Sequence, residues 1–553
     1  MSVRDESYLS FLGLYNFSPI LSIGAHVNYN DYADDKKLAI NRSSNFNSTL
    51  FTKFIPLKKF SITPYGGISR NQQIGITDTG PIYGAEMLIN NVSISEFDLY
   101  SEMKFQNEDI NPRKNTLRNF KFNIDKVFEN SFRNQLLGLY SEQRKDFYFD
   151  ADSLLMDEFE IEKNIQSRIE DKFSIVDRLN LYTGLPGLLF YLEGGAAWRT
   201  IDRDTRYIAL SDIKTSSFDT KIEEFKIDLN TSLRYVKSDF DVLLRLIFSE
   251  REEKHNAKYL DGTSEVIYKL RQEQEKRKNN IGQHTTLSAL SNFKLSTNDQ
   301  LSLSLFHRKL TYDTPSDLNN DDRDELLSMF SLEYRRKMNP FFNLFANLSG
   351  SINKIVYIFK ERSANNNTLR VAKLSSGGIL NLGYLTSRNE AEVSANYTVY
   401  EFEDLNPNLN SFSFRQLALR DSTSLKLFRT TYFRFLGYLK FSEQGDFSWK
   451  GFANNPVRYL DERYAEPTIE YKYKYFSFAF GLRYFAITTF TFNENNVKQM
   501  QSYYRSTAPL SIITMMLSNS IQISIRGWYE FIRTENNIDQ ELVNLFFRVN
   551  WNI

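Results

Sequence analysis

Apolar and polar residues alternate with a period of two along most of the chain. In AEVSANYTV (391–399), Val393 belongs to the apolar phase and Glu392 to the polar phase. Three further segments alternate in the same way: 521–531, 300–305 and 341–350. Because successive side chains of a strand lie on opposite faces, the pattern predicts strands with one apolar and one polar face.

The phase of this alternation changes within IEYKYKYFSFAFGLRY (469–484). Tyr475 still belongs to the first apolar phase, and Phe476 begins the second. A change of one residue inside an unbroken strand pattern predicts a very tight hairpin turn. We expect similar turns at broadly regular intervals at four other places: 338–340, 387–389, 428–430 and 518–520.

Longer polar segments separate these tight turns: 313–325, 362–368, 402–411, 442–463 and 533–540. Strands of about 12 to 18 residues, with short turns at one end and long loops at the other, are typical of outer-membrane barrels, whereas soluble sandwiches have shorter strands. We therefore predict an all-β fold. It is a single large antiparallel transmembrane β-barrel of about 24 to 26 strands, with short periplasmic turns and long extracellular loops, and it forms one domain over residues 1–553.

Two segments depart from this plan. Residues 251–280 are dense in charge, which indicates either a short helix in a large extracellular loop or strand ends that extend beyond the bilayer. The segment Tyr8–Tyr15 would run towards the periplasm if the tight turns lie there. Either this segment is not a barrel strand, or an upstream strand is missing from this chain. We favour the second alternative and expect the genuine N-terminus to lie further upstream.

Composition supports interleaved rather than clustered apolar groups. The chain contains 46 Phe and 32 Tyr, yet its mean hydropathy is −0.45. Lys+Arg and Asp+Glu balance at 68 each, which does not favour a nucleic-acid partner. There is no cysteine, which excludes disulfides, cysteine-ligated metals and cysteine nucleophiles. No apolar run reaches the roughly 18 residues of a membrane-spanning helix.

The chain ends on ELVNLFFRVNWNI, which alternates apolar and polar residues. This ending resembles the C-terminal assembly signal of bacterial outer-membrane β-barrel proteins, although the last residue is Ile rather than an aromatic one. The resemblance implies a location in the bacterial outer membrane, with membrane lipid, lipopolysaccharide and the barrel-assembly machinery as partners. A plug, lipoprotein or periplasmic subunit is a further candidate partner. The candidate signal residues are Phe547, Val549, Trp551 and Ile553.

Enzyme chemistry finds little support in the sequence. The four histidines form no HExxH motif, and no GxGxxG, P-loop or GxSxG motif is present. His307 is interpreted as a wall residue. The acidic segment NNDDRDE (319–325) has oxygen ligands for a cation but lacks EF-hand spacing, so a solvated loop is favoured. We expect no catalytic residues, no metal and no cofactor.

The polar phases of the strands supply the candidate lumen-facing residues. Both signs of charge occur among them, which predicts a lumen without strong charge selectivity. They are Glu333, Arg335, Glu392, Glu470, Lys472, Lys474, Arg483, Arg526, Glu530 and Arg548. Phe546 is an apolar residue in this polar phase, and a contact with a loop or a plug would explain it.

Two classes of function fit these features. The first is a channel or transport pore, or the barrel of a larger uptake or export complex. TonB-dependent receptors are similar in barrel size and outer loops, but they carry an N-terminal plug domain, and here the strand pattern begins almost at once. The second is a structural scaffold with a plugged lumen that anchors surface or periplasmic proteins.

Overall fold

A computed structural model describes residues 5–33, 42–128, 132–150, 163–182, 184–207, 219–259, 264–403, 409–492, 497–518, 521–535 and 540–551. The chain divides into two compact units. The first unit comprises Met1–Arg234, Arg245–Thr285 and Thr311–Asp322. The second unit comprises Tyr235–Leu244, Thr286–Leu310 and Arg323–Ile553.

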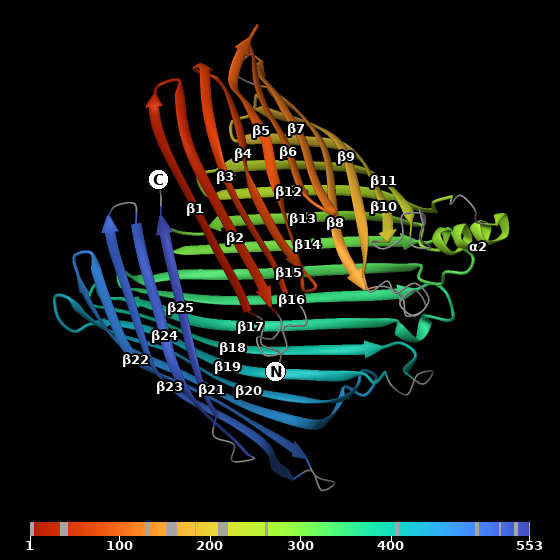
Figure 1. The fold of residues 1–553 in the computed structure, drawn as a ribbon. Coiled ribbons are helices and arrows are strands. Elements are labelled where there is room, and N and C mark those ends of the chain that lie inside the picture. Colours follow the sequence, from red (N-terminus) through yellow and green to blue (C-terminus); the bar gives the residue numbers. More distant parts are fainter. Residues whose placement is uncertain are drawn as a thin grey trace. The chain divides into compact units, whose positions relative to one another are not determined.

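Most of the described chain is β-strand (Figure 1). The strands of the first unit are β1 (Asp5–Ser18), β2 (Leu21–Ala33), β3 (Arg42–Leu57), β4 (Phe60–Gln73), β5 (Ile76–Ile94), β6 (Phe97–Ile110), β7 (Arg113–Phe128), β8 (Phe132–Asp150), β9 (Lys163–Tyr182) and β10 (Leu188–Tyr207). Strands with residues in both units are β11 (Thr220–Lys237), β12 (Phe240–Ala257), β13 (Asn280–Lys294) and β14 (Asp299–Asp313).

The strands of the second unit are β15 (Arg323–Asn339), β16 (Phe342–Tyr357), β17 (Asn367–Asn381), β18 (Leu385–Tyr400), β19 (Phe412–Lys426), β20 (Thr431–Ser448), β21 (Ala453–Tyr473), β22 (Phe476–Phe492), β23 (Lys498–Ser518), β24 (Ile521–Thr534) and β25 (Gln540–Trp551). The described helices are α2 (Glu265–Lys276) and the short 3₁₀ segment η1 (Ser363–Asn365). No helix in the described residues is long and apolar enough to span a membrane.

Sequence neighbours pair with one another in both units. From β1 to β10 each strand pairs antiparallel with the next. The same holds from β15 to β25. The described residues form a sheet of 25 strands, which confirms the predicted all-β class and strand number.

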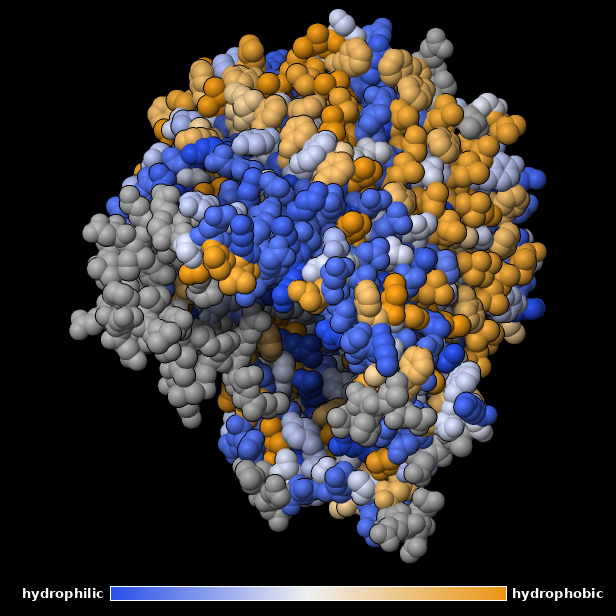
Figure 2. All heavy atoms as spheres, turned by 90° about the vertical axis from the view of Figure 1, so that its right-hand side faces the viewer, coloured by the Kyte–Doolittle hydropathy of each residue, from blue (hydrophilic) through white to orange (hydrophobic). Residues whose placement is uncertain are grey.

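The register keeps apolar side chains on one face of the sheet. On β22, Phe480 and Leu482 are 58% and 45% exposed, and on β25 Val543 and Leu545 are each 70% exposed. Apolar and polar side chains form separate broad fields on the surface in Figure 2. Water-soluble proteins rarely expose large apolar patches, whereas hydrocarbon removes their cost. The fold is therefore that of the large outer-membrane β-barrel class, and its apolar face is suited to lipid.

Two details of the predicted plan are wrong. The turn expected at 387–389 lies at Leu382–Tyr384, where Gly383 adopts a φ of 80° that other residues rarely take. The segment 442–463 is not a loop, because β20 and β21 continue through it and Ser448 pairs with Ala453. A strand end that leaves the bilayer meets water on both faces, so its polar composition resembles that of a loop.

The charged segment 251–280 combines both alternatives left open by the sequence. Strand β12 extends to Ala257, and α2 follows it as a helix of 12 residues. Ser264 caps this helix by accepting a hydrogen bond from the backbone N–H of Ile267. Figure 1 shows α2 beyond the ends of β12 and β13.

Candidate functional site

The polar face of β17 to β24 carries paired charges, and we call it the ion-pair face. Its best-buried carboxylate is Glu392, which is 4% exposed. Glu392 accepts from Arg420 Nη1 at 2.7 Å, and Lys373 Nζ lies 2.7 Å from the same carboxylate. Lys373, Glu392 and Arg420 lie on the adjacent strands β17, β18 and β19. Their side chains meet because the register aligns the polar phases of these strands. A carboxylate shielded from water needs such partners.

A second group of charges lies on β20, β21 and β24. Arg434 pairs with Glu470 at 2.7 Å, and Lys472 lies 3.7 Å from the same carboxylate. Arg526 Nη2 lies 3.2 Å from both oxygens of Glu466. The two signs therefore neutralise one another over short distances, which agrees with the expectation of a face without a strong net field.

Aromatic rings and arginines form a continuous strip on the same face. The rings of Tyr438 and Tyr464 stack with centroids 5.2 Å apart. Arg483 lies 5.6 Å from the Tyr464 ring and 4.8 Å from the Trp528 ring. Trp528 in turn stacks on Phe546 at 5.4 Å, with the ring planes 16° apart. Phe546 thus contacts the wall itself, which accounts for an apolar residue in the polar phase of β25.

The remaining candidate lumen residues have simpler surroundings. Arg335 pairs with Glu333 at 2.6 Å on β15. Glu530 accepts hydrogen bonds from Ser506 and Tyr504, and Arg548 donates to Asn550 at 3.0 Å. Lys474 lies in the turn between β21 and β22, with a φ of 47°, and not in a strand.

The sequence interpretation named only part of this face. It missed four charged residues that complete the pairs: Lys373, Arg420, Arg434 and Glu466. Glu466 lies in the same alternating phase of β21 as Glu470, so the period-two pattern contained that information. Lys373, Arg420 and Arg434 lie on β17, β19 and β20, on which the sequence analysis names no candidate. Which charges are partners depends on the register between strands, and the sequence does not give that register.

The C-terminal strand carries the predicted assembly signal. Phe547 and Val549 lie on its apolar face and are 65% and 48% exposed. Trp551 pairs with Ile521 at the end of β25, and Ile553 lies outside the described residues. The role of these residues in assembly stays a prediction.

The polar face of β2 to β7 in the first unit is rich in amides, and we call it the amide face. Its members share the polar phase of their strands: Asn28, Asn45, Asn47, Asn71, Gln73, Gln106, Asn115, Asn119 and Asn123. Five of them have a buried side-chain oxygen without a hydrogen-bond partner in the described part of the chain: Asn28, Asn45, Asn47, Asn119 and Asn123. Towards the tight turns, the same face also carries the ion pair of Lys104 and Glu86, at 2.6 Å.

A fully buried arginine supports the amide face. Arg113 has no exposed surface and donates to Asp78 at 2.6 Å and to Asn71 Oδ1 at 2.7 Å. The Tyr148 hydroxyl also donates to Asp78, at 3.0 Å, and the Tyr148 ring lies 4.8 Å from the guanidinium. These contacts join β4, β5, β7 and β8 at the end of the strands where the two-residue turns 74–75 and 111–112 lie.

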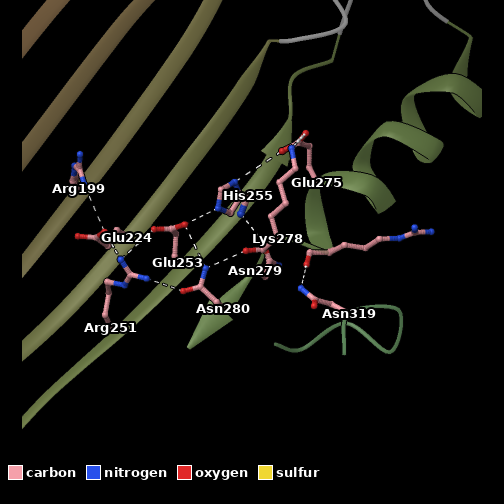
Figure 3. Close-up of polar contacts among 11 residues, drawn as sticks. Arg199, Glu224, Arg251, Glu253, His255, Glu275, Lys278, Asn279, Asn280 and Asn319 are labelled. Atoms are coloured by element: carbon pink, nitrogen blue, oxygen red, sulfur yellow. Dashed lines mark hydrogen bonds and ion pairs between the residues drawn. The ribbon is translucent and has the colours of Figure 1, made fainter. Parts of the chain in front are cut away.

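A third polar network fastens α2 to the strand ends (Figure 3). His255 Nε2 lies 2.7 Å from Glu253, and His255 Nδ1 lies 3.9 Å from Glu275 of α2. The Asn279 side chain accepts from the backbone N–H of His255 at 2.7 Å. Arg251 donates to Asn280 at 2.9 Å. Gln272 of α2 donates to Asn256 at 3.1 Å, so the helix is held to the end of β12 through Gln272 and Glu275.

Lys258 extends this network beside β10. Its ammonium lies 2.6 Å from Asp204 and 3.1 Å from Asp202. Burial lowers the pKa of Lys258, but the hydrogen bonds to the two aspartates outweigh burial and raise the pKa above its ordinary value of 10.5.

Neither the acidic segment 319–325 nor His307 belongs to an assembled catalytic or metal centre within the described residues. Asp322 accepts from the backbone N–H of Thr314 at 2.7 Å, and Glu325 pairs with Arg323 at 2.9 Å. His307 forms a hydrogen bond with Ser328 at 2.9 Å. Among the described residues, no group of three or more His, Asp or Glu side chains is arranged to hold a metal ion.

No protein-family model matches the chain, and no curated protein matches its sequence. Among solved structures, it is similar to the FrpB iron transporter from Neisseria meningitidis (F5-1 variant), with 9% identity, a TM-score of 0.44, and coverage of 86% of this chain and 80% of that one. The copper transporter OprC is similar at 9% identity and a TM-score of 0.46, over 92% and 80% of the chains. BauA, the ferric preacinetobactin receptor from Acinetobacter baumannii, is similar at 10% identity and a TM-score of 0.40, over 95% and 84%. At such low scores, the fold class rests on the chain's own strand order and register.

Proposed function

We propose that the protein is a transport pore of the outer membrane, acting alone or as the barrel of a larger uptake or export complex. The observation that carries the proposal is the pair of unlike sheet faces. One face exposes apolar side chains suited to lipid, and the other bears the amide face and the ion-pair face. Charged and amide groups at membrane depth require water or partners, so a polar face of this extent is suited to a water-filled lumen.

The chemistry of the polar face indicates what such a pore would select. Opposite charges neutralise one another at short range, as around Glu392 and Glu466. Pores that select for the sign of an ion carry rings of one charge. We therefore expect a pore that admits polar solutes with little preference between cations and anions.

Single-channel recording in planar bilayers tests this function. The purified protein should give steady conductance steps, and the reversal potential in a salt gradient should lie close to zero. Absence of conductance in protein that shows heat-modifiable migration on gels would contradict an open pore. A strongly cation- or anion-selective current would contradict the proposal that the polar face lines the lumen with balanced charges.

A scaffold that anchors partner proteins is the second candidate, and α2 favours it. The outer side of this helix exposes Val266, Ile267 and Leu270, which are 68%, 51% and 61% exposed. Exposed apolar side chains on a helix beyond the strand ends are suited to contact with another protein. A scaffold would give no conductance, and it would be recovered from outer membranes with a partner whose association is weakened by Leu270→Glu.

A further inference from the structure

The amide face borders a cavity of about 320 Å³ in the first unit, near the turns 74–75 and 111–112. Strands β3, β4, β6 and β7 supply Asn45, Asn71, Gln106 and Asn115 to its lining. The end of β8 completes it with residues 143–147. Small-molecule sites occupy about 300 to 1,000 Å³, so this cavity is at the small end of that range. We call it the amide pocket.

The amides of the pocket are held in fixed orientations by the protein around them. Asn71 Oδ1 accepts from Arg113 at 2.7 Å, and Gln106 Oε1 accepts from the Tyr65 hydroxyl at 2.9 Å. Gln73 Oε1 accepts from the backbone N–H of Tyr148 at 3.2 Å. In each of these three amides, the carbonyl oxygen accepts a hydrogen bond from a surrounding protein group. Within the described residues, the amide nitrogen donates to no protein group.

Other lining residues add acceptors. Thr116 and Gln143 line the pocket, and a hydroxyl or a primary amide both donates and accepts hydrogen bonds. The pocket therefore offers N–H donors and oxygen acceptors. Hydroxyl groups also donate and accept at once, so a ligand with several hydroxyls would satisfy both kinds of group.

The charges of the lining favour a neutral ligand. Arg144 and Lys145 balance Glu108 and Asp146. Three of these four already have protein partners. Arg144 donates to Asp146 at 3.0 Å, and Glu108 accepts from Asn115 at 2.8 Å. An ionic ligand would meet no net field of the opposite sign.

An aromatic ring completes the pocket. Phe147 is half-buried and belongs to the lining. A pyranose ring presents C–H groups on one face, and these pack on an aromatic ring while the hydroxyls at its rim bond to amides. We propose that the amide pocket binds a neutral carbohydrate, of one or two sugar rings. This is a binding site in its own right, and it does not require the protein to conduct.

Calorimetric titration of the full-length protein tests the site. Lauryldimethylamine oxide is a suitable detergent because its headgroup is not a sugar. The probes are maltose and cellobiose, with glucuronate and inorganic phosphate as charged comparators. We expect at least one neutral disaccharide to bind, and both charged probes to bind more weakly.

Variants locate the binding. Asn45→Leu and Phe147→Ala should each weaken the affinity about tenfold or more. Asn123→Leu is the matched control, because Asn123 is also an amide of the amide face with an unpartnered oxygen but does not line the pocket. Its affinity should equal that of the wild type. Heat-modifiable migration checks that each variant is folded.

Three results would overturn the proposal: no heat of binding for either disaccharide at about 10 mM, tighter binding of a charged probe, or an equal loss in the Asn123→Leu control. Conductance measured on the same preparation separates the site from the pore. Sugar binding without conductance would contradict the proposed transport pore but support the carbohydrate site. Conductance without sugar binding would support the pore but contradict the carbohydrate site.

Discussion

The amide face of the first unit and the ion-pair face of the second differ in the polar groups that they carry and in the partners of those groups. Both are polar surfaces on strands whose opposite face is apolar. On the ion-pair face, the carboxylates of Glu392 and Glu470 pair with cations on neighbouring strands. Some polar atoms of this face, such as Asn396 Oδ1, are nevertheless buried without a hydrogen-bond partner in the described residues. On the amide face, Asn45 and Asn119 keep buried oxygens without a protein partner in the described residues. The two faces therefore differ in the kind of polar group that they carry: one has charges paired across strands, and the other has mostly neutral amides.

The largest expected effect comes from the arginine that supports the amide face. Arg113→Met leaves Asp78 buried without its guanidinium, and we expect a loss of about 3 to 5 kcal/mol in unfolding free energy. Urea titration followed by the gel-migration shift measures it. Arg133→Met is the control: Arg133 pairs with Asp125 but is 49% exposed, so its loss should be about 1 kcal/mol or less. Equal losses of unfolding free energy in the two variants would show that burial does not determine how much each arginine contributes to stability.

An intermediate effect is expected on the ion-pair face. Glu392→Gln removes the carboxylate shared by Lys373 and Arg420, but both cations are more than a third exposed and can be hydrated. We expect a loss of about 1 to 3 kcal/mol in unfolding free energy by the same titration. Glu333→Gln is the control, because its partner Arg335 is 63% exposed. A larger loss of unfolding free energy for Glu392→Gln than for Arg113→Met would contradict the prediction that the buried arginine of the amide face contributes more than the carboxylate of the ion-pair face.

The stacked pair at the end of the ion-pair face should contribute less. Phe546→Ala removes a ring that is 59% exposed and stacks on Trp528, so we expect a loss of about 1 kcal/mol and a change in tryptophan fluorescence. Phe547→Ala, on the apolar face, should instead reduce the amount of protein recovered in the outer membrane. If Phe546→Ala reduces recovery and Phe547→Ala does not, the assignment of the assembly signal is wrong.

The smallest effect is expected at the loop end, where Lys258 lies between two aspartates. Because the pKa of Lys258 is raised in the folded protein, its stabilisation is fully present below the ordinary pKa of 10.5 and is lost as the pH rises through the folded value. Lys258→Met should therefore destabilise the protein slightly at neutral pH, by about 1 kcal/mol or less for a partly exposed pair. The difference from wild type should shrink above pH 10.5 in thermal unfolding. A difference that stays constant with pH would exclude the charge as its cause.

Alternation in the sequence determined the fold class, the strand number and the face on which most candidate residues lie. Glu392, Arg483 and Arg526 were assigned to the polar face because the side-chain period of a strand is fixed at two. The same reasoning fails where a strand leaves the bilayer, since both faces then meet water, and it misread the extended ends of β20 and β21 as a loop.

Only the tertiary structure decided which residues meet. Pairing depends on the register between strands, and register is a property of contacts between segments rather than of any one segment. The structure places Phe546 against Trp528, Arg113 between Asn71 and Asp78, and the end of β8 beside the amides of β3 to β7. A period of two separates a polar face from an apolar one, but it does not distinguish an amide whose oxygen accepts a hydrogen bond from one whose oxygen has no partner.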